Sequence, residues 1–305
     1  MQRLVTLADL STADVERIFA VTKDLKSKHA VGLREPILPG RVMALLFEKP
    51  SLRTRVSFEA AMAHLGGSSL FLGADVGFGS RESVEDFSRV LSEFVDVVVM
   101  RTHAHDTVVQ LAEHCSCAVI NGLTDLAHPC QALADLYTLR ETFGDLKGRT
   151  LAYVGDGNNV ARSLATGCAM LGVRFVLAAP PAYQFDDAFL GRLAKQVPGR
   201  DVSMTDDPAT AVADAMAVYT DVWASMGQEA ETEKRRRDFA DYQVNAKLMS
   251  AAPDDAVFMH CLPAHRGDEV TSEVIDAPNS VVVAQAGNRM HVQKGILTCM
   301  LGTHA

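Results

Sequence analysis

The chain has 305 residues, about twice the length of a typical domain, so two domains are expected. Hydrophobic residues make up 48% of it and charged residues 22%, as in an ordinary globular protein with an ample core. The net charge of −9 argues against nucleic acid or an anionic membrane as a partner, because both require a basic surface. A small anionic substrate remains possible if basic groups gather in a cleft.

The amino terminus and the cysteines predict a cytoplasmic location. No signal-peptide core follows Met1, and no apolar run approaches the ~18 residues of a membrane span. Six scattered cysteines lack the density of a disulfide-rich domain, which predicts reduced thiols. Cys115-x-Cys117 and His103-x-His105 each lack a second ligand pair, so we interpret both as structural or surface residues and expect no metal.

The first part of the chain alternates between helices and apolar strands. Two amphipathic helices are expected within residues 1–35. Strands are then expected at 42–47, 68–72, 96–100 and 118–121, with helices capped by Ser51 and Ser83, at 107–114, and from His128 to about Phe143. Strands that are apolar throughout and alternate with helices predict a parallel sheet covered on both faces.

The polar, glycine-containing segment 144–148 is the expected domain boundary. Strands are expected after it at 150–154, 175–179, 217–223, 256–260 and 280–284, with helices ending near Leu171, at 186–196 and 230–240, and from about Arg289. We interpret the run Lys234–Arg237 as a solvated helix face. The predicted fold class is α/β, an unknotted chain of two doubly wound parallel-sheet domains. Residues 1–143 form the first, joined by the returning C-terminal helix 289–305, and residues 148–285 form the second.

The turn after the first long strand has the features of an anion site. Ser51 is a good N-cap, and Arg53, Thr54 and Arg55 occupy the first helical turn. A helix N-terminus offers unpaired N–H groups to an anion, and guanidinium groups bind oxyanions bidentately. Two arginines at this position oppose the helix dipole unless an anion compensates them. That conflict favours a phosphate or carboxylate site over the alternative of solvated arginines.

Two other strand ends in the first domain carry polar side chains. Arg101 ends one strand, and His128-Pro129-Cys130-Gln131 follows another. Because ligands bind at the carboxyl ends of parallel strands, these groups are expected at the same rim as Arg53. An uncharged His128 imidazole could donate a hydrogen bond to a carbonyl oxygen and polarise it, and a buried turn histidine is the alternative.

The Gly155-x-Gly157 pair in the second domain suggests a dinucleotide loop but fails two requirements. The third glycine position is Val160, and the strand at 175–179 ends without the acid that binds a ribose. Asn158 and Asn159 instead present amide groups that suit the carboxylate of a zwitterionic substrate.

Two later strand ends carry an acid and a thiol. Asp221 precedes Ser225-Met226-Gly227 without histidines at metal spacing, so we interpret it as a ligand for an amine. Cys261 follows His260, but neighbours on a strand point to opposite faces, so His260 is poorly placed as its base. We interpret Cys261 as lining a pocket, with a buried structural cysteine as the alternative. Arg289 adds another guanidinium near a rim.

Together these motifs resemble the ornithine carbamoyltransferases, in order from about residue 3 to residue 302. The matching segments are Phe47–Glu59, His128–Gln131, Gly155–Asn159, Asp221–Gly227, His260–Pro263 and Asn288–His291. The segments Asp221–Gly227 and His260–Pro263 are the specific ones. They separate this family from aspartate carbamoyltransferase and from the knotted carbamoyltransferases for acylated ornithines.

The resemblance implies a role for each matching residue. Carbamoyl phosphate would be held by Ser51, Leu52 (through its backbone), Arg53, Thr54, Arg101, His128, Gln131 and Arg289, with Cys261 and Leu262 at the junction of the two substrates. L-Ornithine would be held by Asn159, Asp221, Ser225 and Met226. The catalytic set is Arg101, His128, Asp221 and Cys261, and no metal or organic cofactor is expected. The family forms trimers, and a neighbouring subunit usually supplies Gln or His where this chain has Gly77.

The expected reaction is therefore carbamoyl transfer from carbamoyl phosphate to the side-chain amine of L-ornithine, giving citrulline and phosphate. Two alternatives remain open. The acceptor could be another amine, such as putrescine, or the chain could be a non-catalytic subunit that binds carbamoyl phosphate or amino acids. Citrulline formation with ornithine against putrescine separates all three.

Overall fold

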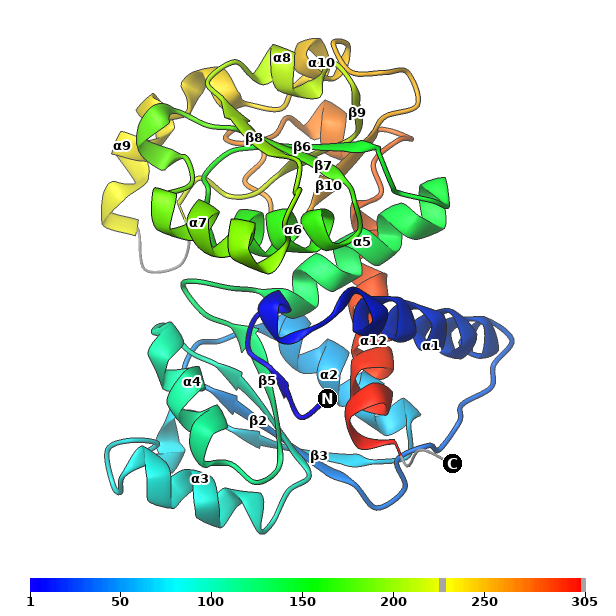
Figure 1. Ribbon diagram of the computed structural model, residues 1–305, viewed down its shortest axis with the longest axis vertical. Coiled ribbons are helices and arrows are strands. Elements are labelled where there is room, and N and C mark those ends of the chain that lie inside the picture. Colours follow the sequence, from blue (N-terminus) through cyan, green and yellow to red (C-terminus); the bar gives the residue numbers. More distant parts are fainter. Residues whose placement is uncertain (225–228, 303–305) are drawn as a thin grey trace. The chain divides into compact units, whose positions relative to one another are not determined.

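The computed structural model describes residues 1–224 and 229–302, and the chain folds into two compact units. Unit 1 comprises Met1–Tyr137 together with the chain from Asn288 onward, and unit 2 comprises Thr138–Gly287 (Figure 1). Both boundaries fall inside helices, α5 (Pro129–Phe143) and α12 (Val282–Leu301), and not in the polar segment 144–148. Because its second half belongs to unit 1, α12 returns to the first domain as predicted.

Unit 1 is built on a five-stranded parallel sheet in the order β1-β5-β4-β2-β3. Its strands are β1 (Arg3–Leu4), β2 (Val42–Phe47), β3 (Ser68–Leu72), β4 (Val97–Arg101) and β5 (Ala118–Leu123). Its helices are α1 (Thr12–Ala30), α2 (Leu52–His64), α3 (Val84–Ser92) and α4 (His105–His114). In Figure 1, α3 and α4 lie on one side of the sheet, and α1, α2 and α12 lie on the other.

Burial explains why the central strands of unit 1 were predictable and β1 was not. Every residue of β4 is buried, as expected for a strand covered on both faces. The two-residue β1 is too short to show any periodicity, and residues 12–30 form a single long helix instead of part of two. The predicted caps Ser51 and Ser83 are both confirmed, and Ser11 caps α1.

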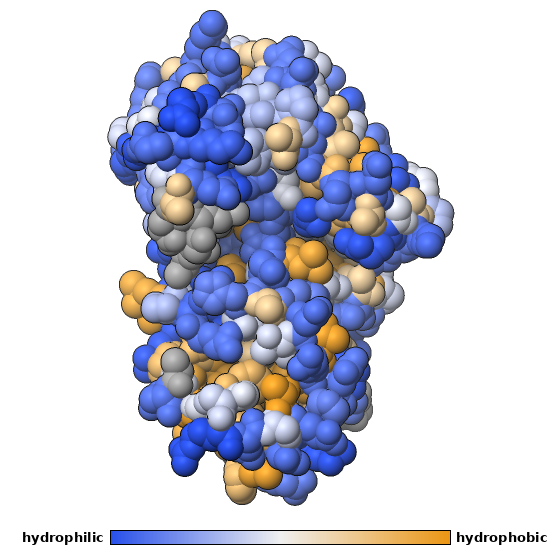
Figure 2. All heavy atoms as spheres, turned by 90° about the vertical axis from the view of Figure 1, so that its left-hand side faces the viewer, coloured by the Kyte–Doolittle hydropathy of each residue, from blue (hydrophilic) through white to orange (hydrophobic). Residues whose placement is uncertain are grey.

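One edge of unit 1 keeps hydrophobic side chains on the surface. Leu70 and Phe71 of the edge strand β3 are 49% and 40% exposed, and Leu52 and Val56 of α2 are 76% and 52% exposed. Figure 2, which faces the side of α3 and α4, also shows hydrophobic patches within the hydrophilic surface of unit 1. Apolar surface of this kind is typical of a protein–protein interface.

Unit 2 is built on a second five-stranded parallel sheet in the order β10-β9-β6-β7-β8. Its strands are β6 (Thr150–Val154), β7 (Arg174–Ala178), β8 (Val202–Thr205), β9 (Ala215–Thr220) and β10 (Val257–His260). Its helices are α6 (Asn159–Met170), α7 (Asp187–Gln196), α8 (Pro208–Val212), α9 (Thr232–Asp238), α10 (Ala246–Met249) and α11 (Ser272–Ile275). Short 3-10 helices lie in unit 2 at Pro181–Tyr183, Glu229–Glu231 and Ala240–Tyr242, and in unit 1 at Leu7–Asp9 and Ala74–Val76.

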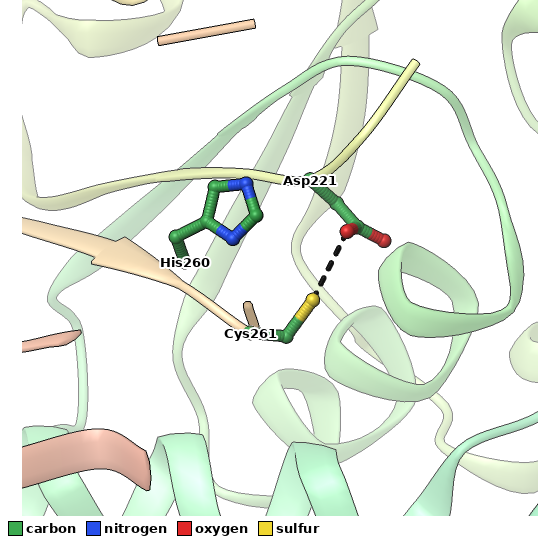
Figure 3. A group of neighbouring side chains, drawn as sticks. All are labelled: Asp221, His260 and Cys261. Carbon is green, nitrogen blue, oxygen red and sulfur yellow. Dashed lines mark hydrogen bonds between the residues drawn. The ribbon is translucent and has the colours of Figure 1, made fainter. Parts of the chain in front are cut away.

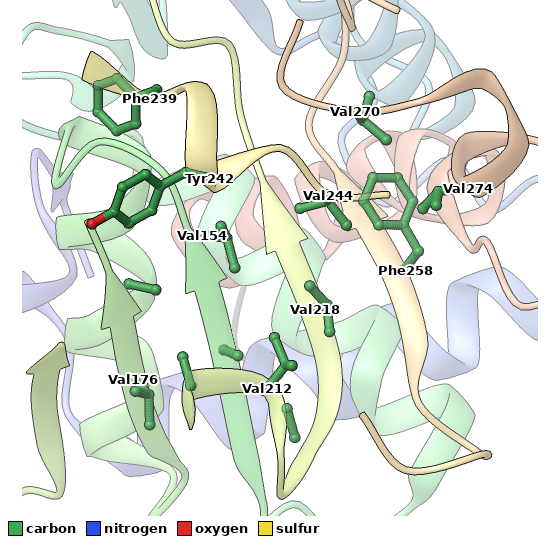
Figure 4. Close-up of a cluster of buried hydrophobic side chains, with 14 of the residues drawn as sticks. Val154, Val176, Val212, Val218, Phe239, Tyr242, Val244, Phe258, Val270 and Val274 are labelled. Atoms are coloured by element: carbon green, nitrogen blue, oxygen red, sulfur yellow. The ribbon is translucent and has the colours of Figure 1, made fainter. Parts of the chain in front are cut away.

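A cluster of buried hydrophobic side chains joins one face of the unit 2 sheet to short helices that cover it. Val154, Val218 and Phe258 project from neighbouring strands into one cluster with Val212 of α8 and Phe239 (Figure 4). Alternate residues of each strand point into this cluster, as the pleat of a strand requires. The two doubly wound sheets confirm the predicted α/β fold class.

The predicted strand at 280–284 is wrong. Only Ser280 forms a bridge, with Phe258, and α12 begins at Val282. Three consecutive valines favour a strand by propensity, but the Gln285 N–H donates to the Val281 carbonyl at 2.8 Å in the first turn of a helix. Val282 is buried and Val283 is 79% exposed, so packing on one side selected the helix. Strand β8 was not predicted at all. No helix in the described ranges is long and apolar enough to cross a membrane.

Candidate active site

Helix α2 begins with the cap that the sequence predicts. Ser51 has an extended backbone, and its Oγ accepts a hydrogen bond from the Thr54 N–H at 3.3 Å. No acidic residue stands in the first turn, so nothing in that turn neutralises Arg53 or the partial positive charge of the helix start. This end of α2 therefore retains the character of an anion site.

Three arginines of unit 1 come together beside Thr54. Arg101, at the end of β4, and Arg289, on α12, both donate to Thr54 Oγ1, at 3.4 Å and 2.8 Å. Arg101 is 7% exposed and Arg289 is 4% exposed. Burial, followed by the charges of Arg289 and Arg53, lowers the pKa of Arg101 to about 10. Like charges held this close in a buried place disfavour one another, and a bound anion would relieve that cost.

The two arginines of the α2 first turn have different surroundings. Arg55 pairs with Glu59 at 3.0 Å, and its guanidinium carbon lies 3.9 Å from the centre of the Phe71 ring. Among the described residues, no ion pair of this kind engages Arg53, whose charge instead acts on Arg101. The structure thus engages Arg55 in contacts within the protein, which distinguishes it from Arg53.

The start of α5 adds a neutral imidazole and an amide to unit 1. His128 is 5% exposed, and burial, followed by the charges of Arg289 and Arg101, holds its pKa well below the usual value. Gln131 Nε2 donates to Asp135 Oδ1 at 2.8 Å, which fixes the orientation of the amide. Gln131 Oε1 is buried and accepts no hydrogen bond from the described part of the chain. A neutral imidazole beside guanidinium groups can donate a hydrogen bond to a carbonyl oxygen.

In unit 2, three donors hold the carboxylate of Asp221, which follows β9. Its Oδ1 accepts from the Val222 N–H at 2.8 Å and from Cys261 Sγ at 3.0 Å, and its Oδ2 accepts from Asn158 Nδ2 at 3.1 Å. Figure 3 shows the thiol pointing at the carboxylate. Asp221 is 7% exposed, and a carboxylate in so poorly solvated a place can attract an ammonium group more strongly than one in water.

Contacts in the loop after β6 give structural reasons for Gly157 and Asn158. Asn158 caps α6, because its Oδ1 accepts from the Val160 and Ala161 N–H groups at 2.9 Å and 3.1 Å. The Gly157 N–H donates to the Tyr183 carbonyl at 2.8 Å, and a Cβ on Gly157 would lie 2.9 Å from that oxygen. This close approach is a structural reason for the glycine that needs no dinucleotide.

Asp221, His260 and Cys261 offer ligand atoms within 4.8 Å of one another, a grouping that the sequence analysis did not anticipate. His260 Nδ1, however, accepts from the Leu262 N–H at 2.8 Å, and its Nε2 lies 3.1 Å from Glu269 Oε1. Both ring nitrogens are therefore occupied within the protein. The imidazole has no lone pair left for a metal or for deprotonating Cys261.

One interpretation from the sequence is wrong for Arg235. The run Lys234–Arg237 was expected to be solvated, but Arg235 is only 6% exposed. Its Nη1 donates to Asp156 Oδ2 at 2.6 Å and to the Trp223 carbonyl at 2.8 Å. The sequence does carry a sign of this burial, because Arg235 precedes the apolar Phe239, the C-cap of α9, by four residues and so lies on the same side of the helix.

Two predicted ornithine ligands, Ser225 and Met226, lie outside the described residues.

Gly77 has a φ of +72°, and a Cβ there would lie 2.5 Å from Arg81 Cδ. The side chain of Arg81 therefore already occupies the space beside Gly77, and Ser80 Oγ donates to the Gly77 carbonyl at 3.0 Å.

Comparisons with known proteins agree with this geometry. Residues 2–141 match the carbamoyl-P binding domain of aspartate/ornithine carbamoyltransferase, and residues 147–300 match its Asp/Orn binding domain. An ornithine carbamoyltransferase from Bacillus subtilis is 51% identical over 301 residues, which cover 98% of this chain and 93% of the relative. The structure of a Pyrococcus furiosus ornithine carbamoyltransferase superposes with a TM-score of 0.96 at 46% identity, covering 100% of this chain and 98% of that one. The corresponding Thermus thermophilus structure gives 0.89 at 41% identity, covering 99% of each chain. The chain therefore belongs to the aspartate/ornithine carbamoyltransferase family.

Proposed function

We propose that this enzyme transfers the carbamoyl group of carbamoyl phosphate to the side-chain amine of L-ornithine, giving L-citrulline and phosphate, as part of arginine metabolism. The observation that carries the proposal is the convergence of Arg53, Arg101 and Arg289 at the capped start of α2. A buried group of like charges suits a ligand with a doubly charged phosphate. The relatives named ornithine carbamoyltransferase support the choice of acceptor.

The proposed carbamoyl-phosphate site belongs to unit 1. The N–H groups at the start of α2 and the three guanidinium groups would bind the phosphate. The proposed set is Ser51, Leu52, Arg53, Thr54, Arg101, His128, Gln131 and Arg289. His128, Thr54 and Arg101 would donate to the carbonyl oxygen as it gains negative charge, and each such donor is worth roughly 3 kcal/mol in the transition state.

The proposed ornithine site belongs to unit 2. Asp221 would bind the α-ammonium of ornithine, and Asn159 its carboxylate, with Ser225 and Met226 completing the set and Cys261 and Leu262 beside the reacting amine. The side-chain amine has a solution pKa of about 10, and only its neutral form attacks. The amine nitrogen bonds to the carbonyl carbon, the bond from that carbon to the phosphate oxygen breaks, and the departing phosphate takes the proton from the nitrogen.

The test is product formation by the purified chain from carbamoyl phosphate with ornithine or with putrescine. We expect citrulline from ornithine and little product from putrescine. Replacing Arg53 with Gln should abolish turnover, whereas the matched Arg55→Gln variant, one residue along the same turn, should remain active. Preferred carbamoylation of putrescine, or tight binding of carbamoyl phosphate without any product, would contradict the proposal.

The chain is also proposed to act as a cytoplasmic homo-oligomer, with a trimer implied by the family resemblance. The exposed hydrophobic side chains of α2 and β3 support an interface on unit 1, because Leu52, Val56, Leu70 and Phe71 are all at least 40% exposed. Analytical ultracentrifugation should give a species larger than one chain, and Phe71→Glu should shift it towards the monomer. A wild-type protein that sediments as a monomer at micromolar concentration would contradict the assembly.

A further inference from the structure

The turn after β10 contains an unusual backbone position. Leu262 has a φ of +58° and is the only non-glycine residue with a positive φ in the described ranges. A left-handed conformation costs an L-residue with a side chain about 1–2 kcal/mol, and such positions persist only where the surroundings hold them. Contacts of the neighbouring residues must therefore maintain the backbone conformation of Leu262.

The imidazole of His260 makes the contact that fixes this turn. Its Nδ1 accepts the Leu262 N–H at 2.8 Å, which requires that Nδ1 carries no proton. A neutral ring then carries its proton on Nε2, and that nitrogen faces Glu269 Oε1 at 3.1 Å. The backbone N–H of His260 donates to Gln285 Oε1 at 3.0 Å, so the residue is held from both sides.

Glu269 connects the same imidazole to the far end of the turn. Its Oε1 also accepts the His265 N–H at 2.6 Å, and its Oε2 is buried with no hydrogen-bond partner among the described residues. The side chains of His260 and Glu269 are both fully buried, so neither can touch a substrate. An ionisable pair in an apolar core is a weak source of stability, because desolvation offsets its attraction. A role other than stability is therefore the better explanation of the pair.

We infer that His260 and Glu269 are positioning residues for the reaction: Glu269 fixes the ring of His260, and His260 fixes the backbone of Leu262 beside Cys261. The inference rests on the proposed function, which places Leu262 and Cys261 next to the reacting amine. The pair acts only through the turn, so it sets the geometry of the attack without taking part in proton transfer. A misplacement of about 1 Å can cost about 100-fold in rate.

Two amide variants of His260 separate the two hydrogen bonds of the ring. The oxygen of Asn superposes on the Nδ1 position, so His260→Asn keeps an acceptor for the Leu262 N–H and gives up the bond to Glu269. The amide of Gln reaches the Nε2 position instead, so His260→Gln keeps the bond to Glu269 and leaves the Leu262 N–H unpaired. Positioning through Leu262 predicts that kcat falls about 100-fold in His260→Gln and less than tenfold in His260→Asn.

Three further readouts decide whether the role is only structural. Both variants should show similar melting temperatures, and inorganic phosphate should inhibit both as it inhibits the wild type, because its proposed site lies in unit 1. Glu269→Gln serves if His260→Gln does not fold; it should lower kcat several-fold per folded molecule. Equal kcat in both His260 variants, or a loss of activity that only follows the melting temperature, would overturn the inference. A wild-type protein that makes no citrulline would instead refute the proposed function, and the inference with it.

Discussion

The polar clusters of unit 1 and unit 2 have opposite charge. In unit 1, the buried Arg101 and Arg289 and the half-buried Arg53 bring like charges together, and the pKa of Arg101 is lowered to about 10 by burial and by its neighbours. In unit 2, Asp221 is one charge surrounded by three hydrogen-bond donors. The proposed phosphate site would gain its counter-charge only from a bound anion, whereas the Asp221 carboxylate already has donors within the protein.

This difference predicts how each site responds when a charge is removed. Taking a cation from unit 1 removes affinity but also removes repulsion, so activity and stability should separate. Taking the anion from unit 2 leaves donors without an acceptor, so activity and stability should fall together.

Arg289→Met should lower kcat/KM for carbamoyl phosphate about 1,000-fold, because a buried donor and a phosphate-binding charge are both lost. The melting temperature should stay the same or rise, since Arg101 loses a like charge nearby. Steady-state kinetics and thermal unfolding without ligand measure the two effects. A matched change outside the site, Arg236→Met on the exposed face of α9, should leave kinetics unchanged. A strong loss of stability in Arg289→Met would mean that the guanidinium is held as a structural group.

Asp221→Asn should lower kcat/KM for ornithine about 100-fold, because the carboxylate that faces the ammonium is lost. It should also destabilise the fold by about 1–3 kcal/mol, since an amide group now faces at least one of the three former donors. Denaturant unfolding measures the second effect. Full stability together with lost activity would show that the hydrogen bonds of the carboxylate contribute little to folding.

Arg235→Met should destabilise unit 2 by roughly 3 kcal/mol, because it leaves Asp156 and the Trp223 carbonyl without their buried partner. The double variant Arg235→Met with Asp156→Asn should recover part of that loss. Chemical denaturation of the two single variants and the double variant gives the coupling energy. Additive losses in the double variant would show that the two side chains do not stabilise one another.

The ionisation of His291 should make the stability of the fold depend weakly on pH. Burial and the charges of Lys294 and Lys26 lower the pKa of His291 to about 3, and its ring lies 5.0 Å from that of His29. The unfolded chain binds this proton near pH 6.5, so unfolding takes up a proton between the two values and stability falls as the pH drops below about 6.5. His291→Gln should make the melting temperature fall less steeply as the pH drops from 6.5 to about 4.5. An unchanged slope would assign the effect to other groups, beginning with His29 and His64, whose pKa values are lowered by burial as well.

The site of unit 1 was the more predictable half because its signals are local. Ser51, Arg53 and Thr54 lie within one helical turn, and the arginines that oppose the helix dipole are visible in the sequence itself. The arrangement around Asp221 was only partly predictable. Asp221 was recognised at a strand end, but its donors Asn158 and Cys261 come from other strands, and no spacing along the chain reveals those contacts.

Sequence pattern determined the two-sheet α/β architecture, the caps of the main helices and the family, because hydrophobic periodicity and contiguous motifs are properties of short stretches of chain. Tertiary structure alone decided that residues 282–284 coil into α12 and that Arg235 pairs with Asp156. In each of these cases the deciding contact joins elements far apart in the chain or selects one face of a helix. Local propensity carries no information about such a contact.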